Sequence, residues 1–278
     1  MADNEWITGK VSLTIKGNPV EMEMTVPAFP VKPYRMLPVI QQMTNSFVAE
    51  SVADDQVQGR SVSCKAGCGA CCRQPVPIAE AEVYQIAELV ESMPEPRRSV
   101  IKQRFADGVA HFRSIGWFSR INDEFSGDGP KDSKEAAAKA MDVVMDYFRE
   151  GIPCPFLENE SCSIHPSRPL SCREYLVTTP AENCASPTAE TIRRVEMMAQ
   201  PSKALKQFTA TEQLKGEGLV TLIRALELAE KYSDNYPEKT GDVWMSEFFG
   251  SLAKAGKPAP TEPPAFKSRL KKNSRWRK

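Results

Sequence analysis

Two stretches of sequence decide the fold: residues 64–72 read CKAGCGACC, and residues 154–184 read CPFLENESCSIHPSRPLSCREYLVTTPAENC. Together they hold all eight cysteines of the 278-residue chain, four in each stretch. Short spacings allow a tight turn to direct two sulfurs at one centre, and Gly67 and Gly69 permit a backbone that folds this closely. The pattern therefore predicts metal ligation rather than scattered buried thiols.

The rest of the chain bears on the oxidation state of these cysteines. The N-terminus reads MADNEWITGK, with acids where a secretory signal has basic residues, so we expect a cytoplasmic protein. No run approaches the roughly 18 apolar residues that a membrane span needs. In a reducing compartment, eight cysteines favour metal ligation or redox chemistry over structural disulfides.

Eight thiolates satisfy two four-sulfur sites, each of which is tetrahedral zinc or an iron-sulfur cluster such as 4Fe-4S. A single site with spare, redox-active cysteines is the other arrangement. Adjacent side chains diverge, so Cys71 and Cys72 rarely reach the same single metal ion, which favours a cluster or two centres. The candidate metal ligands are Cys64, Cys68, Cys71, Cys72, Cys154, Cys162, Cys172 and Cys184.

Other residues near these cysteines in the sequence suit a metal site. Four thiolates around zinc or an oxidised four-iron cluster leave about two negative charges, which nearby cations stabilise. His165 lies three residues after a cysteine and could replace one sulfur; the other interpretation is a loop histidine that hydrogen-bonds its neighbours. The candidate cations are Lys65, Arg73, Arg168 and Arg173.

Outside the cysteine segments, the hydrophobic pattern predicts a mainly α protein with a small N-terminal β-hairpin (α+β). Apolar and polar residues alternate over 11–26, which is typical of a hairpin. The irregular cysteine-rich segments are expected to form a metal-binding core packed among helices. Helices are predicted over 36–52, from about 83 to 90, 96–116, 134–150, 188–199, 218–232 and 243–253.

Charge and composition divide the chain into four predicted sections. Lys+Arg and Asp+Glu balance at 36 each, yet residues 267–278 hold seven basic side chains and no acid. This tail could attach the protein to a nucleic acid or an acidic protein, or act as a solubilising terminus. The sections are an N-terminal hairpin and helix (1–59), a metal-binding domain (60–186), a helical section (187–256), and a Pro-rich linker with a basic disordered tail (257–278).

The two cysteine stretches resemble the cysteine-cluster (YkgJ-type) family, whose members are described as zinc- or iron-chelating. The resemblance covers roughly residues 60–185: the Cys-Gly-x-Cys-Cys core, the acidic helix with Glu80 and Glu82, the Cys-Pro-Phe-Leu entry and the Cys-Arg close. His165 stands where such proteins often carry an aromatic residue. The resemblance implies metal binding through the cysteines, with some members described as iron-sulfur proteins, and no defined substrate. From the cysteines alone, the first hypothesis is a metal-binding protein whose centre is structural or used in electron transfer.

Two further hypotheses remain. The Cys64-x3-Cys68-x2-Cys71 spacing is that of radical S-adenosylmethionine enzymes, and a similar cysteine core occurs in methyl-transferring flagellin lysine methylases. However, Ala70 replaces the usual aromatic residue, and the helices after Cys72 do not suggest a βα barrel. The other hypothesis is a zinc-stabilised interaction module that binds nucleic acid through its basic tail. The sequence alone assigns no reaction.

Overall fold

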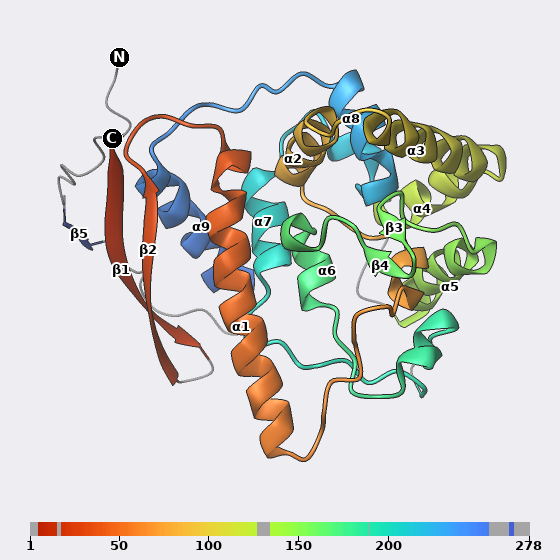
Figure 1. Ribbon diagram of the computed structural model, residues 1–278, viewed down its shortest axis with the longest axis horizontal. Helices are drawn as coiled ribbons and strands as arrows, with labels where there is room; N and C mark the ends of the chain where they lie inside the picture. The colour runs from red at the N-terminus through yellow and green to blue at the C-terminus, as the bar shows by residue number, and fades with distance from the viewer. Residues whose placement is uncertain (1–4, 16–17, 127–133, 189, 256–266, 270–278) are drawn as a thin grey trace.

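The computed structural model describes residues 5–15, 18–126, 134–188, 190–255 and 267–269. Within these ranges the chain is mainly helical, with an antiparallel hairpin near the N-terminus and a small second hairpin (Figure 1). The predicted fold class is therefore confirmed. The α-helices are α1 (Leu37–Val57), α2 (Glu80–Glu91), α3 (Arg97–Ser114), α4 (Trp117–Ser126), α5 (Lys134–Glu150), α6 (Leu170–Glu174), α7 (Pro201–Thr209), α8 (Ala225–Lys231) and α9 (Gly241–Ala255).

The strands and short helices complete the described elements. The strands are β1 (Trp6–Ile15), β2 (Asn18–Pro27), β3 (Leu157–Glu158), β4 (Ser161–Cys162) and β5 (Lys267–Arg269). The 3-10 helices are η1 (Pro33–Met36), η2 (Ala70–Arg73), η3 (His165–Ser167), η4 (Ala181–Ala185), η5 (Lys215–Glu217) and η6 (Leu222–Arg224). None of the described helices is both long enough and apolar enough to cross a membrane.

The N-terminal hairpin forms because its strands alternate apolar and polar residues. Its register pairs Val11 with Met22 and Leu13 with Val20, which keeps apolar side chains on one face. On its other edge, β1 pairs with β5, so three residues of the basic tail extend the sheet. The remainder of the predicted linker and tail lies outside the described residues. An isolated hairpin is marginal in water, so this one depends on the helices beside it.

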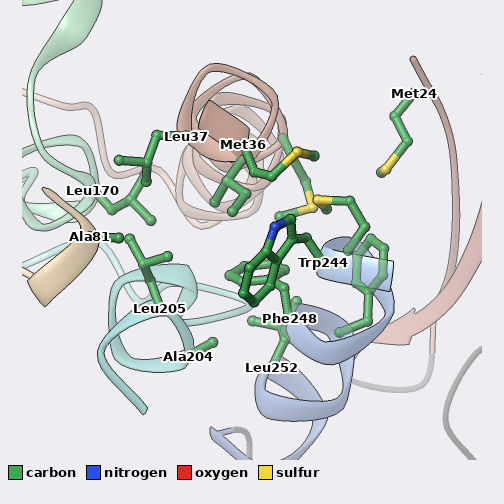
Figure 2. Close-up of a cluster of buried hydrophobic side chains, with 14 of the residues drawn as sticks. Met24, Met36, Leu37, Ala81, Leu170, Ala204, Leu205, Trp244, Phe248 and Leu252 are labelled. Atoms are coloured by element: carbon green, nitrogen blue, oxygen red, sulfur yellow. The ribbon is translucent and has the colours of Figure 1, made fainter. Parts of the chain in front are cut away.

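A first hydrophobic core joins this hairpin to α1, α7 and α9 (Figure 2). Met36, Leu37 and Phe248 are completely buried there. Trp244 lies between α9 and the start of α1, and its indole N–H donates to the Val31 carbonyl at 2.7 Å. Each such side chain contributes about 1.5–3 kcal/mol on burial. Because this core contains residues of sections 1–59, 60–186 and 187–256, those predicted sections share one interior; their boundaries stay a prediction.

A second core lies among α2, α3 and α8 and is lined on one side by the cysteine segments. Phe105 of α3 packs edge-on against Phe156, with ring centroids 5.4 Å apart. Three of the candidate ligands, Cys154, Cys162 and Cys172, pack against this core and are half-buried. The position of the second cysteine segment is therefore set by hydrophobic packing as well as by any metal.

A third, smaller core joins the end of α3 to α4 and α5. Phe112 and Tyr147 stack with ring centroids 3.9 Å apart, and the Trp117 indole donates to the Val143 carbonyl at 2.8 Å. The sequence does not predict α4. Its apolar residues Trp117 and Ile121 are buried but span only one helical turn, which is too short a pattern to stand out.

The helix predicted over 188–199 is wrong. In the described part of this segment the chain runs extended beside residues 176–178, and the Val195 N–H donates to the Leu176 carbonyl at 2.9 Å. The Thr178 N–H donates in turn to the Arg193 carbonyl at 2.9 Å. These cross-chain hydrogen bonds occupy backbone groups that a helix would use, so tertiary context overrides a weak local preference. The helix predicted over 218–232 occurs as η6 followed by α8.

Candidate metal centre

The first cysteine segment folds as two tight turns in sequence. The Cys68 N–H donates to the Lys65 carbonyl at 3.1 Å, and the Cys72 N–H donates to the Gly69 carbonyl at 3.0 Å. Gly67, the third residue of the first turn, has φ +82°, a left-handed conformation that glycine adopts at little cost. The close backbone predicted from the two glycines is confirmed.

The second cysteine segment is longer and supplies its thiols from a loop and three short elements. Cys154 precedes the β3–β4 hairpin, Cys162 lies on β4, Cys172 lies on α6 and Cys184 lies on η4. The hairpin turn uses Asn159 and Glu160, both with positive φ. Such a two-residue turn brings the strands back on themselves within a very short length.

Direct contacts join the two segments. The Cys154 N–H donates to the Cys72 carbonyl at 2.7 Å. Arg73 extends from η2 to Glu160, where its Nη2 lies 2.7 Å from Oε1 and its Nη1 lies 3.0 Å from Oε2. The Ser63 N–H also donates to the Val177 carbonyl at 3.0 Å. The fold therefore brings together two sulfur-bearing stretches that are about 80 residues apart in the sequence.

All eight cysteines are free thiols, and several influence one another electrostatically. Burial is the main reason that the pKa of Cys154 rises to about 12 and that of Cys184 to about 11. A hydrogen bond with Cys72, followed by burial, raises the pKa of Cys71. The thiolate of Cys71 also raises the pKa of thiols in both segments, namely Cys64, Cys154, Cys162, Cys172 and Cys184.

The described residues do not form a ready coordination sphere. No three or more histidine, cysteine, aspartate or glutamate side chains in this part of the chain are positioned to hold a metal ion. The structure thus gathers the two segments, while the assignment of individual sulfurs to a site stays a prediction. The donor set itself is suited to zinc and to iron-sulfur clusters, because both prefer thiolate ligands.

Three of the four predicted cations, Arg73, Arg168 and Arg173, interact electrostatically with the thiols. The charge of Arg168 lowers the pKa of Cys71 and Cys162, against the larger effects that raise both. Arg173 is 3% exposed and donates to the Arg168 carbonyl at 3.0 Å and to Asn45 Oδ1 at 2.8 Å. Burial lowers the pKa of Arg173 to about 10. These arginines supply positive charge where metal-bound thiolates would leave a negative excess.

His165 is exposed at the start of η3, and its ring Nε2 contacts the Arg168 guanidinium. Its pKa is lowered by burial of part of the ring and by the charges of Arg168 and Arg173. This contact matches the interpretation of a loop histidine that hydrogen-bonds a neighbour. Metal ligation by His165 stays untested.

The acidic residues at the start of α2 connect the cysteine segments to the rest of the fold. Glu82 is 1% exposed; its Oε2 accepts the Ala79 N–H and its Oε1 accepts the Leu170 N–H, each at 2.8 Å. It thus caps α2 and holds the first residue of α6, the helix with Cys172. Glu80 accepts the N–H and the hydroxyl of Thr211, at 2.8 and 2.6 Å.

Replacing Glu82 by glutamine should lower the free energy of unfolding by about 1.5 kcal/mol, because an amide N–H₂ would face a backbone donor and one charge-assisted hydrogen bond would be lost. Denaturant titration of the two proteins measures this difference. The matched control is Glu88→Gln on the same helix, an exposed residue paired with Arg35, where the loss should be within about 0.5 kcal/mol. Equal losses for the two variants would show that Glu82 does not hold α6.

Comparison with known proteins agrees with this arrangement. Residues 63–203 match the family described as "CxxCxxCC: Putative zinc- or iron-chelating domain". The match covers half of the chain and contains every cysteine, the capping glutamates and the start of α7. Neither the curated proteins nor the solved structures gave a significant match. The chain therefore belongs to the CxxCxxCC family of zinc- or iron-chelating domains.

Proposed function

We propose that the protein binds an iron-sulfur cluster through its cysteines and uses it in a structural or electron-transfer role. The observation that carries this proposal is the direct contact between the two four-cysteine segments, where the Cys154 N–H donates to the Cys72 carbonyl and Arg73 pairs with Glu160. Eight thiols in two groups of four favour a cluster over one tetrahedral zinc, because a single zinc ion needs only four of them. Zinc is the other candidate, since it also accepts four thiolates.

The proposed ligands are drawn from the eight cysteines. Each thiol must lose its proton to bind a metal, so the raised pKa values of the buried thiols Cys154 and Cys184 make metal binding weaker as the pH falls. Arg168 and Arg173 would offset part of the negative charge of the thiolates. A cluster would supply a one-electron store, whereas zinc would supply only a cross-link between segments. We further propose that the protein works in a reducing compartment such as the cytoplasm, because thiols stay reduced and available to a metal there.

Anaerobic purification followed by metal analysis tests the proposal. We expect iron and acid-labile sulfide in the protein, together with broad visible absorption from sulfur-to-iron charge transfer, because thiolate-bound clusters are coloured. If the purified protein is colourless and contains zinc, the site is a zinc site and the cluster proposal is wrong. A protein that binds neither metal, purified both with and without added iron and zinc, would contradict the proposal altogether.

A further inference from the structure

The β3–β4 hairpin has a buried base and an exposed tip. At the base, Phe156 is 1% exposed, and its carbonyl accepts the Ser163 N–H at 2.9 Å. At the tip, the side chain of Glu160 is 51% exposed. The ladder between them has two residue pairs, and a hairpin this short is marginal on its own. The position of the tip therefore depends on the contacts that it makes with other segments.

The tip lies directly on the turn between Cys68 and Cys71. In Figure 1 the orange segment that contains this turn lies next to the β3 and β4 arrows. A Cβ at Gly69, within the turn, would lie 2.8 Å from Leu157 Cδ1 and 3.1 Å from Glu160 Cα. Contacts this close leave no room for a methyl group, so the hairpin covers one side of a turn that holds two candidate ligands.

Arg73 fastens the tip to this turn. Its two Nη atoms bind the two carboxylate oxygens of Glu160, at 2.7 and 3.0 Å, and its Nη1 also donates to the Gly69 carbonyl at 3.1 Å. A bidentate pair of this kind is stronger and more directional than a single contact. Both side chains are nevertheless partly exposed, at 32% and 51%, and exposed ion pairs contribute little to stability. The tip is therefore held by a contact that breaks at small cost.

The base of the hairpin is held from its other side by α3. Arg104 Nη1 donates to the Pro155 carbonyl at 3.1 Å, and it lies 3.9 Å from Glu158 Oε1. Arg97 Nη2 lies 3.6 Å from the same Glu158 oxygen. These contacts join the hairpin to α3 and not to the cysteine turn. The tip can thus lift from Gly69 while the base keeps its place.

Candidate ligands lie on both sides of the contact between the tip and the turn. Cys162 is on β4, whereas Cys68 and Cys71 belong to the turn against which the tip packs. A metal held by thiols of both segments joins the hairpin to this turn. Lifting the tip separates the two groups of ligands, so it breaks metal–sulfur bonds on one side and opens the centre to solvent.

We propose that the β3–β4 hairpin is a latch over the cysteine centre, which lifts to admit or release the metal. Arg73 and Glu160 close the latch, and the packing at Gly69 sets how far it shuts. This inference rests on the proposed metal-binding function and adds a kinetic control to it, because the closed latch slows the exchange of metal with solvent. Zinc and an iron-sulfur cluster are both subject to it, since the latch acts on the ligand segments and not on the metal.

Release of metal to a chelator tests the latch. Full-length protein purified with its metal is mixed anaerobically with an excess of EDTA, and the loss of metal is followed over time. Glu160→Gln should release metal about threefold faster, because the amide keeps the shape of the side chain but loses the bidentate ion pair. Salt screens exposed pairs, so higher ionic strength should speed release from the parent protein and not from this variant.

The direction of this effect separates a latch from a simple effect of charge. Removing the negative charge of Glu160 makes the surroundings of the thiolates more positive, which by itself would hold a metal–thiolate centre more tightly. Slower release from Glu160→Gln would therefore overturn the latch. Gly69→Ala is a second variant without a change of charge, and it should speed release about tenfold, because its Cβ would push against the Glu160 backbone.

The matched control is Glu158→Gln, which removes the same charge from the α3 side of the hairpin. The ion pairs of Glu158 with Arg97 and Arg104 are long, so this variant should release metal at the rate of the parent protein. Denaturant unfolding should show unchanged stability for both glutamine variants, so that faster release reports the hairpin and not global unfolding. Equal acceleration by Glu158→Gln, or equal release rates for Glu160→Gln and the parent protein, would also overturn the latch.

Labelling of thiols in the metal-free protein keeps the test independent of the proposed function. A small aromatic disulfide reacts with accessible thiolates, and peptide mass analysis reports the rate at Cys68 and Cys71. We expect these two cysteines to be labelled about threefold faster in Glu160→Gln than in the parent protein. If no metal binds, the proposed function fails, whereas faster labelling would still show that the hairpin opens. Unchanged labelling would overturn the latch.

Discussion

Replacing Cys71 by serine should empty the metal centre and destabilise the fold by about 5 kcal/mol or more. Cys71 adjoins Cys72, whose carbonyl accepts the Cys154 N–H, so its loss removes a candidate ligand where the two segments touch. Structural metal sites supply about 10–16 kcal/mol of apparent binding free energy in small domains, and much of this is folding free energy. Metal content per chain and denaturant unfolding under anaerobic conditions measure the two effects.

The control for this change is Ser161→Ala, because Ser161 is exposed beside Cys162 and is not a candidate ligand. It should retain full metal content and a free energy of unfolding within about 0.5 kcal/mol of the parent protein. A chelator added to the parent protein should reproduce the loss of stability seen with Cys71→Ser. If Cys71→Ser kept its metal and its stability, the metal would have to be bound without Cys71, and the proposed centre would be wrong.

The sequence predicts those parts of the fold in which local pattern and tertiary packing agree. Alternation over 11–26 reflects a strand pair with one buried face, and the Ala- and Lys-rich run of α5 has high intrinsic helix propensity. The segment 188–199 fails because its backbone donors and acceptors pair with residues 176–178, which no window of local sequence contains. Long-range pairing is the physical reason for the error.

The candidate site, like the fold, is predicted by the sequence only in part. Cysteine spacing predicts the chemistry of the centre, because thiolates on tight turns bind few metals other than zinc and iron. Cysteine spacing cannot predict how the two segments meet. Their meeting depends on two hydrogen bonds, one from the Leu170 N–H to Glu82 and one from the Cys154 N–H to the Cys72 carbonyl. The ion pairs that join Arg113 and Arg224 through Glu227 are likewise invisible to sequence reasoning, because Arg113 is far from the other two residues in the chain.

Replacing Gly241 by alanine should lower the free energy of unfolding by about 2–3 kcal/mol, through the contact between β2 and the first residue of α9. A Cβ at Gly241 would lie 2.7 Å from Val26 Cβ and 2.9 Å from both Pro27 Cδ and the Pro27 carbonyl oxygen. A β-carbon, a proline ring and a backbone carbonyl cannot rotate away as a long side chain can. The helix must therefore move off the hairpin, which opens the first core around Trp244.

Gly250→Ala on the same helix is the matched control, because a Cβ there meets nothing within 4 Å. The free energy of unfolding of this variant should rise by about 0.5–1 kcal/mol, because alanine loses less backbone entropy than glycine in a helix interior. The midpoints of thermal and denaturant unfolding should therefore shift in opposite directions in the two variants, although the chemical change in α9 is the same. A stabilised Gly241→Ala would mean that the hairpin does not dock on α9 as closely as these distances require, and that the N-terminal sheet is held by α1 alone.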